Sequence, residues 1–243
     1  MTIFSYHLVN LSLLDAAKKI FVNPISKKTP GLIHSEYMTA MTLGSAVFST
    51  SRVLIGKVAI FMQWENESSL DDYLNNTHFG KIMSKGWHVR LSFLRQWGRF
   101  SHFQIPSQKE DLEPTNSVVV AVTIAKMKPF SVPRFIRWGR PVEKLVRDHP
   151  EAIFSLASVK FPNTVSTFSI WKSVNGMTDM VLGHSHTKKP KRHLDAMNER
   201  ERKNFHFEFT TLRFKPLGEY GSWESKTNFI PITEYQKSNG NSL

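Results

Sequence analysis

The chain has 243 residues, of which 40% are hydrophobic and 12% aromatic, enough for one large domain or two small ones with buried cores. Its 32 lysine and arginine residues outnumber 20 acidic ones, and the net charge of +12 predicts attraction to an acidic membrane surface, nucleic acid or a carboxylated small molecule. Because cysteine is absent, disulfides, thiolate metal sites and cysteine nucleophiles are excluded.

The N-terminal stretch 1–21 lacks the basic, apolar and small-residue regions of a signal peptide. We therefore expect it to form part of the fold. The longest apolar run, residues 118–125, is far shorter than the roughly 20 residues that span a bilayer. These features favour a cytoplasmic protein whose membrane contact, where it occurs, is peripheral.

The first half of the chain predicts the order strand, helix, strand, strand, helix, strand. These elements are expected at residues 2–11, 13–21, 37–46, 58–64, 69–83 and 87–94. The order is that of a ferredoxin-like unit.

The second half predicts the same order, with more local evidence. Residues 117–127 are dense in β-branched side chains, which is typical of a buried strand. Residues 132–150 carry apolar side chains at helical spacing, and Pro150 marks the end of that helix. The remaining elements are expected at residues 152–161 and 166–174 (strands), 176–185 (a short helix), 193–203 (its displaced continuation) and 205–214 (the closing strand).

A weak internal repeat relates the two halves. Residues 60–74 align with residues 167–181, which places Trp64 over Trp171, and His88 and His206 fall at matching places. We therefore predict an α+β fold in which two ferredoxin-like repeats form a pseudo-dimeric α/β barrel. The expected parts are an N-terminal half (1–103), a linker with two prolines (104–116), a C-terminal half (117–223) and a polar tail (224–243).

The role of one histidine near the end of the chain has two interpretations. His193 begins a charged helical segment, and the strand that follows carries Glu208 and Arg213. Solvated surface histidines are common on such segments, but one imidazole on a rigid element also suits a haem iron. His184 and His186 precede it, so three histidines for zinc or non-haem iron are a weaker alternative.

Two further residues near this segment are candidates for a site. Trp171 is either a core aromatic or a neighbour of a bound cofactor. Glu208 lies among phenylalanines, so it is either an exposed edge group or a buried functional one. Glu208 and Arg213 have an odd separation on one strand, which predicts that they point to opposite faces.

The basic run 186–193, "HTKKPKRH", is the best local candidate for binding an anionic membrane. Attraction between exposed charges is screened over about 8 Å at physiological salt. We therefore expect binding to anionic vesicles to weaken strongly as salt is added in a sedimentation assay. Binding that ignores salt, or no binding at low salt, would remove the membrane hypothesis.

Several other classes of protein have no support in the sequence. No RNA- or DNA-binding motif is present, so no nucleic-acid partner is expected. A glycine-rich phosphate loop, a dinucleotide fingerprint and a nucleophile elbow are also missing.

From about Tyr37 to Trp223, the chain resembles the spheroidene monooxygenase family of carotenoid-modifying enzymes. The family's closing segment matches without gaps, and "TLGSA", "GWHVRLSFLRQWGRF", "GRPVEKLVRDHPEAIFSLA" and "TFSIW" agree as well. The chain departs from the family at Ala46, Arg200 and the pair Phe205 and His206. The matching residues of the closing segment are His193, Ala196, Phe205, Glu208, Arg213 and Phe214.

The resemblance implies the dimeric α/β barrel shared by haem-dependent oxygenases, haem-degrading enzymes and aldoxime dehydratases. It implies a monooxygenase that uses haem iron on a hydrophobic, carotenoid-like substrate, with electrons from an external donor. His193 would be the iron ligand and Arg213 would pair with a haem propionate, while Trp171 and Glu208 are the catalytic candidates. A non-catalytic binding protein of the same fold and a haem-dependent dehydratase or haem-degrading enzyme are the alternatives, and the oligomeric state stays open, a homo-oligomer included.

Overall fold

The computed structural model describes residues 1–21, 29–46, 49, 51–101, 103–105, 114–185, 187, 190–202 and 206–231, with the backbone alone for 132–136 and 200. Helices are α1 (Leu13–Phe21), α2 (Glu67–Asn76), α3 (His78–Met83), α4 (Val132–Arg147), α5 (Val174–Leu182) and α6 (Arg192–Arg202), and a 3-10 turn covers Pro129–Ser131. The strands are β1 (Ile3–Asn10), β2 (Leu32–Met41), β3 (Val53–Trp64), β4 (Trp87–Arg99), β5 (Val119–Met127), β6 (Ala152–Lys160), β7 (Thr164–Trp171) and β8 (His206–Tyr220).

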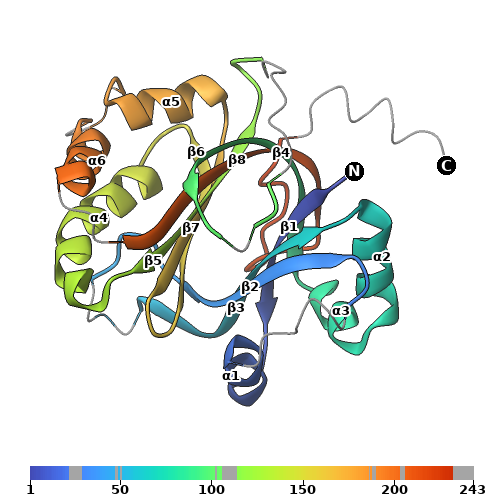
Figure 1. The fold of residues 1–243 in the computed structure, drawn as a ribbon. Coiled ribbons are helices and arrows are strands. Elements are labelled where there is room, and N and C mark those ends of the chain that lie inside the picture. The colour runs from blue at the N-terminus through green and yellow to red at the C-terminus, as the bar shows by residue number, and fades with distance from the viewer. Residues whose placement is uncertain are drawn as a thin grey trace.

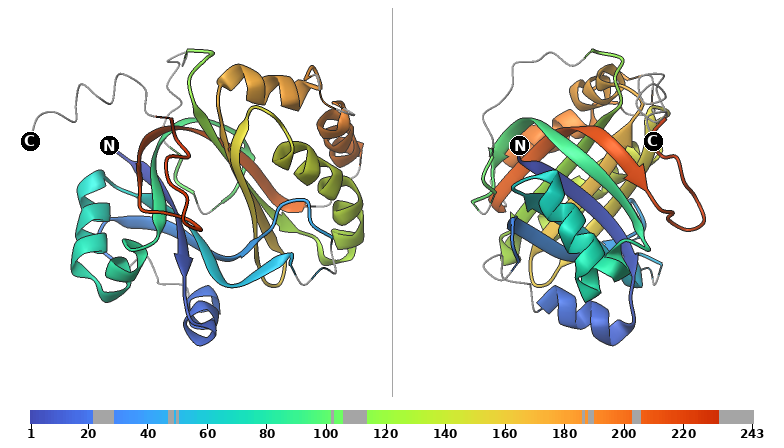
Figure 2. Two further views of the ribbon diagram at one scale, coloured as in Figure 1. Left: turned by 180° about the vertical axis from the view of Figure 1, so that it is seen from behind. Right: turned by 90° about the vertical axis from the view of Figure 1, so that its right-hand side faces the viewer.

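The eight strands form one closed antiparallel barrel in the order β1-β3-β2-β6-β7-β5-β8-β4. The two halves of the chain join where β2 pairs with β6 and where β4 pairs with β8. Helices α1, α2 and α3 lie outside the first four strands, and α4, α5 and α6 lie outside the last four (Figures 1 and 2). The α/β barrel is therefore a single body to which both halves contribute.

The predicted element order is present, but several boundaries differ: β3 begins five residues earlier than predicted, and β4 and β8 end five and six residues later. The predicted strand at 37–46 is β2, which begins at Leu32 because it pairs with β3 from there, and the chain turns at Gly44, where φ is +72°. The predicted helix at 69–83 divides into α2 and α3, because the Thr77 side chain caps α3 by accepting a hydrogen bond from the Gly80 N–H.

Other sequence expectations have only a partial outcome. The linker and the tail fall largely on residues 106–113 and 232–243, outside the described residues. Superposition of the two halves as repeats stays a prediction. Within the described part of the chain, no helix is long and apolar enough to cross a membrane.

The interior of the barrel is packed with aromatic side chains from both halves. Tyr6 stacks on Phe168 with ring centroids 4.0 Å apart, and Phe4 stacks on Phe61 at 5.7 Å. Such contacts bury large apolar areas and stabilise the closed barrel. The layer between the first-half sheet and its helices is also filled, by buried side chains that include Ile60, Met62, Trp64, Tyr73, Phe79 and Met83.

A stack of polar rings lies on the first half of the sheet. His88 lies between His7 and Tyr220, with ring centroids 4.9 and 4.8 Å away. Burial and then the nearby Arg90 lower the pKa of His88 to about 4, although Asp71 opposes them. Burial also lowers the pKa of His7 well below its usual value. Both histidines are therefore neutral at neutral pH.

We expect this stack to make the fold sensitive to mild acid. Because the folded-state pKa of His88 is below the unfolded value near 6.5, the unfolded chain takes up the proton first. The free energy of unfolding is then highest above pH 6.5 and falls by about 3 kcal/mol from His88 alone as the pH drops to 4. Urea unfolding of His88→Phe over this range should show a shallower loss than the wild type.

The exposed His78 provides the matched control. His78→Gln should keep the wild-type dependence on pH. If His88→Phe and the wild type lose stability equally between pH 6.5 and 4, His88 does not carry the effect.

Candidate functional site

A cavity of about 410 Å³ lies between the outer face of the second-half strands and helices α4, α5 and α6. Most of its walls are apolar and include Ala121, Val142, Val146, Val165, Met177 and Met180. The matching layer of the first half is filled by side chains. Ligand sites are commonly apolar cavities of this size with a few polar groups, so this hollow is the candidate site.

His193 lies at the start of α6 and lines the cavity. Its Nδ1 is 3.2 Å from the carbonyl oxygen of Val181, which can only accept a hydrogen bond. Nδ1 therefore carries a proton, and in the neutral imidazole the lone pair is on Nε2. That tautomer is the one in which an imidazole binds a metal through Nε2.

The three-histidine alternative gains no support. His184 is exposed and is not among the residues that line the cavity, and His186 lies outside the described residues. No group of three or more potential metal-binding side chains occurs within the described ranges.

Trp171 and Arg213 line the same cavity as His193. Trp171 is buried, and its Nε1 donates a hydrogen bond of 2.9 Å to the Ser169 hydroxyl. Arg213 is half-buried, and its guanidinium lies 4.8 Å from the centre of the Trp97 ring. The structure thus brings together three of the four predicted site residues.

Glu208 is apart from the other three and is not among the residues that line this cavity. Its Oε1 accepts a hydrogen bond of 3.2 Å from the Ser101 backbone N–H. Thr210 and Leu212 lie on the same face of the strand as Glu208, and both are buried. Phe209, Thr211 and Arg213 lie on the opposite face and line the cavity. Glu208 therefore lies on the other face of β8 from Arg213, as the odd separation predicts, and its catalytic role stays a prediction.

The sequence prediction that His88 and His206 occupy corresponding places in the two halves is wrong. His88 pairs with His7, and at the corresponding point of the second half Thr211 pairs with Thr123. His206 lies five residues earlier, because β8 begins before that point.

His206 is a site residue that sequence reasoning missed. It is buried, lines the cavity and lies 5.1 Å from the Phe209 ring. No local pattern separated it from the other histidines.

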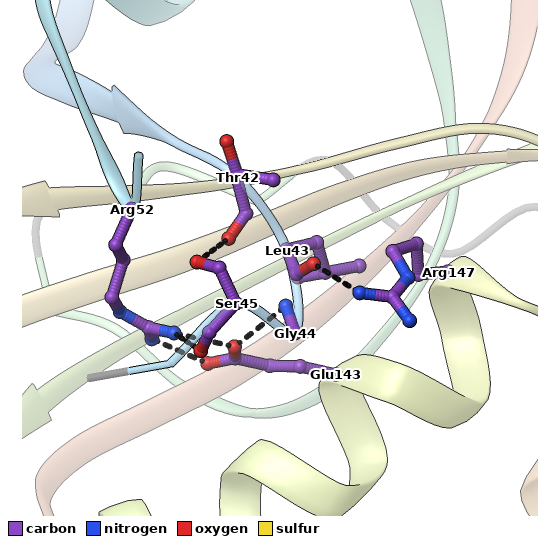
Figure 3. Close-up of polar contacts among 7 residues, drawn as sticks. All are labelled: Thr42, Leu43, Gly44, Ser45, Arg52, Glu143 and Arg147. Carbon is purple, nitrogen blue, oxygen red and sulfur yellow. Dashed lines mark hydrogen bonds and ion pairs between the residues drawn. The ribbon is translucent and has the colours of Figure 1, made fainter. Parts of the chain in front are cut away.

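An ion pair between distant segments closes one part of the wall, and it too was missed. Arg52 donates from Nη2 to Glu143 Oε1 at 3.0 Å and from Nη1 to Oε2 at 3.2 Å (Figure 3). Both residues line the cavity, and their side chains are only 12% and 10% exposed. Such a two-point contact is among the stronger kinds of ion pair.

The backbone before β3 completes this network. Gly44 donates its N–H to Glu143 Oε2 at 3.0 Å, and Arg52 Nη1 donates to the Ser45 carbonyl at 2.8 Å. A side chain at Gly44 would meet Lys144 at 2.9 Å, so the close approach requires glycine. The segment "TLGSA", flagged only by resemblance, thus holds the first half of the chain against α4.

The basic run is only partly described. Lys191 is exposed, and Lys191 and Arg192 line an open hollow that also contains Arg137. His186, Lys188 and Lys189 lie outside the described residues. Binding of this run to a membrane stays a prediction.

Comparison with known proteins identifies a fold. No protein-family model and no curated protein matches the chain. An aldoxime dehydratase in complex with butyraldoxime is 8% identical, with a TM-score of 0.50 over 90% of this chain and 80% of that one. A putative monooxygenase from Fusobacterium nucleatum subsp. nucleatum is 9% identical, with a TM-score of 0.39 over 91% and 94%. An uncharacterized ferredoxin-fold protein related to antibiotic biosynthesis monooxygenases, from Listeria monocytogenes, is 12% identical, with a TM-score of 0.28 over 92% and 97%.

At these identities, the likeness to the aldoxime dehydratase shows the fold alone. In this chain that fold is a closed antiparallel barrel with helices on its outside, which agrees with the α/β barrel in the sequence prediction, whereas the pseudo-dimeric repeat stays a prediction. None of these three neighbours is described as a spheroidene monooxygenase.

Proposed function

We propose that this protein is a haem-dependent oxygenase that acts on an apolar, carotenoid-like substrate, with His193 as the iron ligand. The observation that carries the proposal is a hollow apolar layer lined by a histidine whose Nδ1 is held by a backbone carbonyl. The family resemblance of the closing segment supports the same residue.

The residues present fit a haem group. Val181 sets the tautomer of His193, and the hydrogen bond also increases the basicity of Nε2. The apolar walls suit a porphyrin, and Arg213 supplies a cation in the same cavity. When bound, haem would supply the redox-active iron needed for oxygen chemistry.

The chain's own residues would orient and shield the reactants. The α5 carbonyl fixes the His193 ring, and Trp171 forms a rigid wall because Ser169 holds its indole N–H. The ion pair of Arg52 with Glu143 on α4 forms part of the cavity wall, where it would limit the entry of water. Electrons would come from an external donor, because the sequence carries no nucleotide-binding motif for a reductase.

One observation favours the second candidate, a non-catalytic protein that binds an apolar or anionic small molecule. Glu208, the carboxylate predicted to be catalytic, is not among the residues that line the cavity. The cavity does contain Glu143, but Arg52 already pairs with it.

An absorbance spectrum of the purified protein, recorded with and without added haem, separates the two candidates. A haem-dependent oxygenase should show a Soret band after haem is added and excess haem is removed. A protein that never acquires this band would favour the non-catalytic candidate.

A further inference from the structure

Two arginines occupy corresponding positions in the two halves of the barrel. Trp64 pairs with Ile3 on β1, and Trp171 pairs with Val119 on β5. Two residues further along these strands, Ser5 pairs with Arg90 and Ala121 pairs with Arg213. Arg90 and Arg213 therefore hold the same place on the outer face of each half.

Arg90 has two carboxylate partners on the helix above it. Its Nη1 is 2.5 Å from Glu67 Oε1, and its Nη2 is 2.6 Å from Asp71 Oδ1. Both acids belong to α2, which follows Trp64 in the chain. The first half thus neutralises its arginine internally.

The second half supplies neither acid. Glu67 and Asp71 follow Trp64 by three and seven residues. The residues that follow Trp171 by the same numbers are Val174 and Thr178, both on α5. The Thr178 hydroxyl already donates to the Val174 carbonyl at 2.8 Å. No carboxylate therefore occupies the corresponding positions above Arg213.

Arg213 has a second cation beside it. Arg95 lies opposite Arg213 across β4 and β8, and both guanidinium groups pack on Trp97, at 4.9 and 4.8 Å from its ring centre. Burial and then Arg95 lower the pKa of Arg213. Within the described residues, the buried Nε of Arg213 has no hydrogen-bond partner, and no carboxylate is paired with its guanidinium.

Arg213 is half-buried, and Arg95 is exposed beside it, outside the cavity lining. The like charge of Arg95 and the burial of Arg213 are both unfavourable until an anion joins the two arginines. We propose that the ligand of this cavity carries a carboxylate that binds at Arg213 and Arg95. The planar guanidinium matches the two oxygens of a carboxylate. The inference rests on the proposed function in that both place a ligand in the same cavity, but it depends on Arg213 and not on His193.

The carboxylate has two sources. It belongs either to a propionate of haem or to an amphiphilic ligand whose apolar chain lies along the cavity. The cavity extends from Arg213 and Ala121 to Phe209 and Ala125 at the other end of the paired strands β5 and β8, so an elongated apolar chain would follow the strands.

Four probes distinguish these sources in equilibrium binding to the full chain: haem, haem dimethyl ester, palmitate and hexadecanol. Each ester or alcohol keeps the apolar body and lacks the carboxylate. Arg213→Gln should weaken binding of at least one acid about tenfold or more, because an ion pair with a charged hydrogen bond is lost, and should leave its neutral counterpart unchanged.

Two further variants control for folding and net charge. Arg95→Gln changes an exposed side chain and should give a smaller effect in the same direction. Arg99→Gln removes the same charge from the exposed end of β4, outside the cavity lining, and should bind all four probes as the wild type does. Circular dichroism confirms that each variant is folded.

The outcomes separate this inference from the proposed function. Haem that binds equally to the wild type, Arg213→Gln and Arg95→Gln, with no loss of palmitate binding, would overturn the carboxylate site and leave haem binding intact. Palmitate binding that depends on Arg213, without haem uptake, would support the site and remove the haem function. A wild type that binds none of the four probes would overturn the inference.

Discussion

Replacement of His193 by alanine is expected to give a folded protein that no longer retains haem. The imidazole supplies the protein's bond to iron, whereas the barrel is held by strand pairing and its aromatic interior. A loss of the Soret band after gel filtration, with an unchanged far-ultraviolet circular dichroism spectrum, would meet the expectation. An altered Soret band would also identify His193 as a ligand.

The controls are the two histidines that precede it. His184→Ala and His186→Ala should keep the wild-type spectrum, since His184 is exposed and is not among the residues that line the cavity. Loss of metal in all three variants would instead indicate a three-histidine site. A His193→Ala protein with the haem content and spectrum of the wild type would show that His193 is not the iron ligand.

Replacement of Glu143 by glutamine is expected to destabilise the fold by about 3 kcal/mol. The amide keeps the shape of the side chain but leaves the Arg52 charge, with its side chain 12% exposed, without its counterion. The Gly44 N–H and the Arg52 guanidinium both donate to this carboxylate. For a chain of this length, the midpoint of thermal unfolding should fall by roughly 10 °C in calorimetry.

Glu151→Gln is the matched control. Glu151 faces Lys172 at 3.9 Å in a largely exposed pair, whose contribution to stability is expected to be below about 1 kcal/mol. If Glu143→Gln unfolds at the same temperature as Glu151→Gln and the wild type, the Arg52–Glu143 ion pair does not stabilise the contact between the β2–β3 segment and α4.

Local sequence signals predicted many of the elements because they act within a few residues. The β-branched run at 117–127 became β5, and the helical spacing after Val132 became α4. The start of β2 could not be found this way, because its position is set by pairing with β3. Thr77 divides the expected helix through a cap that its apolar pattern does not reveal.

The candidate site was predictable only in part. Sequence pattern and resemblance selected His193, Trp171 and Arg213, and the odd separation of Glu208 and Arg213 predicted opposite faces. Glu208 is not among the residues that line the cavity, because β8 is regular from Glu208 to Arg213 and Glu208 lies on the face opposite Phe209, Thr211 and Arg213. Its catalytic role stays a prediction. Arg52 and Glu143 were missed because they are 91 residues apart, and nothing near either residue indicates the other.

The sequence by itself determined the composition limits, the repeated order of elements and the histidine that begins α6, because these depend on residue types and short spacings. Tertiary structure alone decided that the layer between sheet and helices is filled in the first half and contains a cavity in the second. It also decided which of the two corresponding arginines is paired with carboxylates. Arg90 and Arg213 are both arginines on outer faces of strands, but only the packing of α2 brings carboxylates to Arg90. Contacts of this kind depend on which strands and helices become neighbours, so they are settled only when the barrel closes.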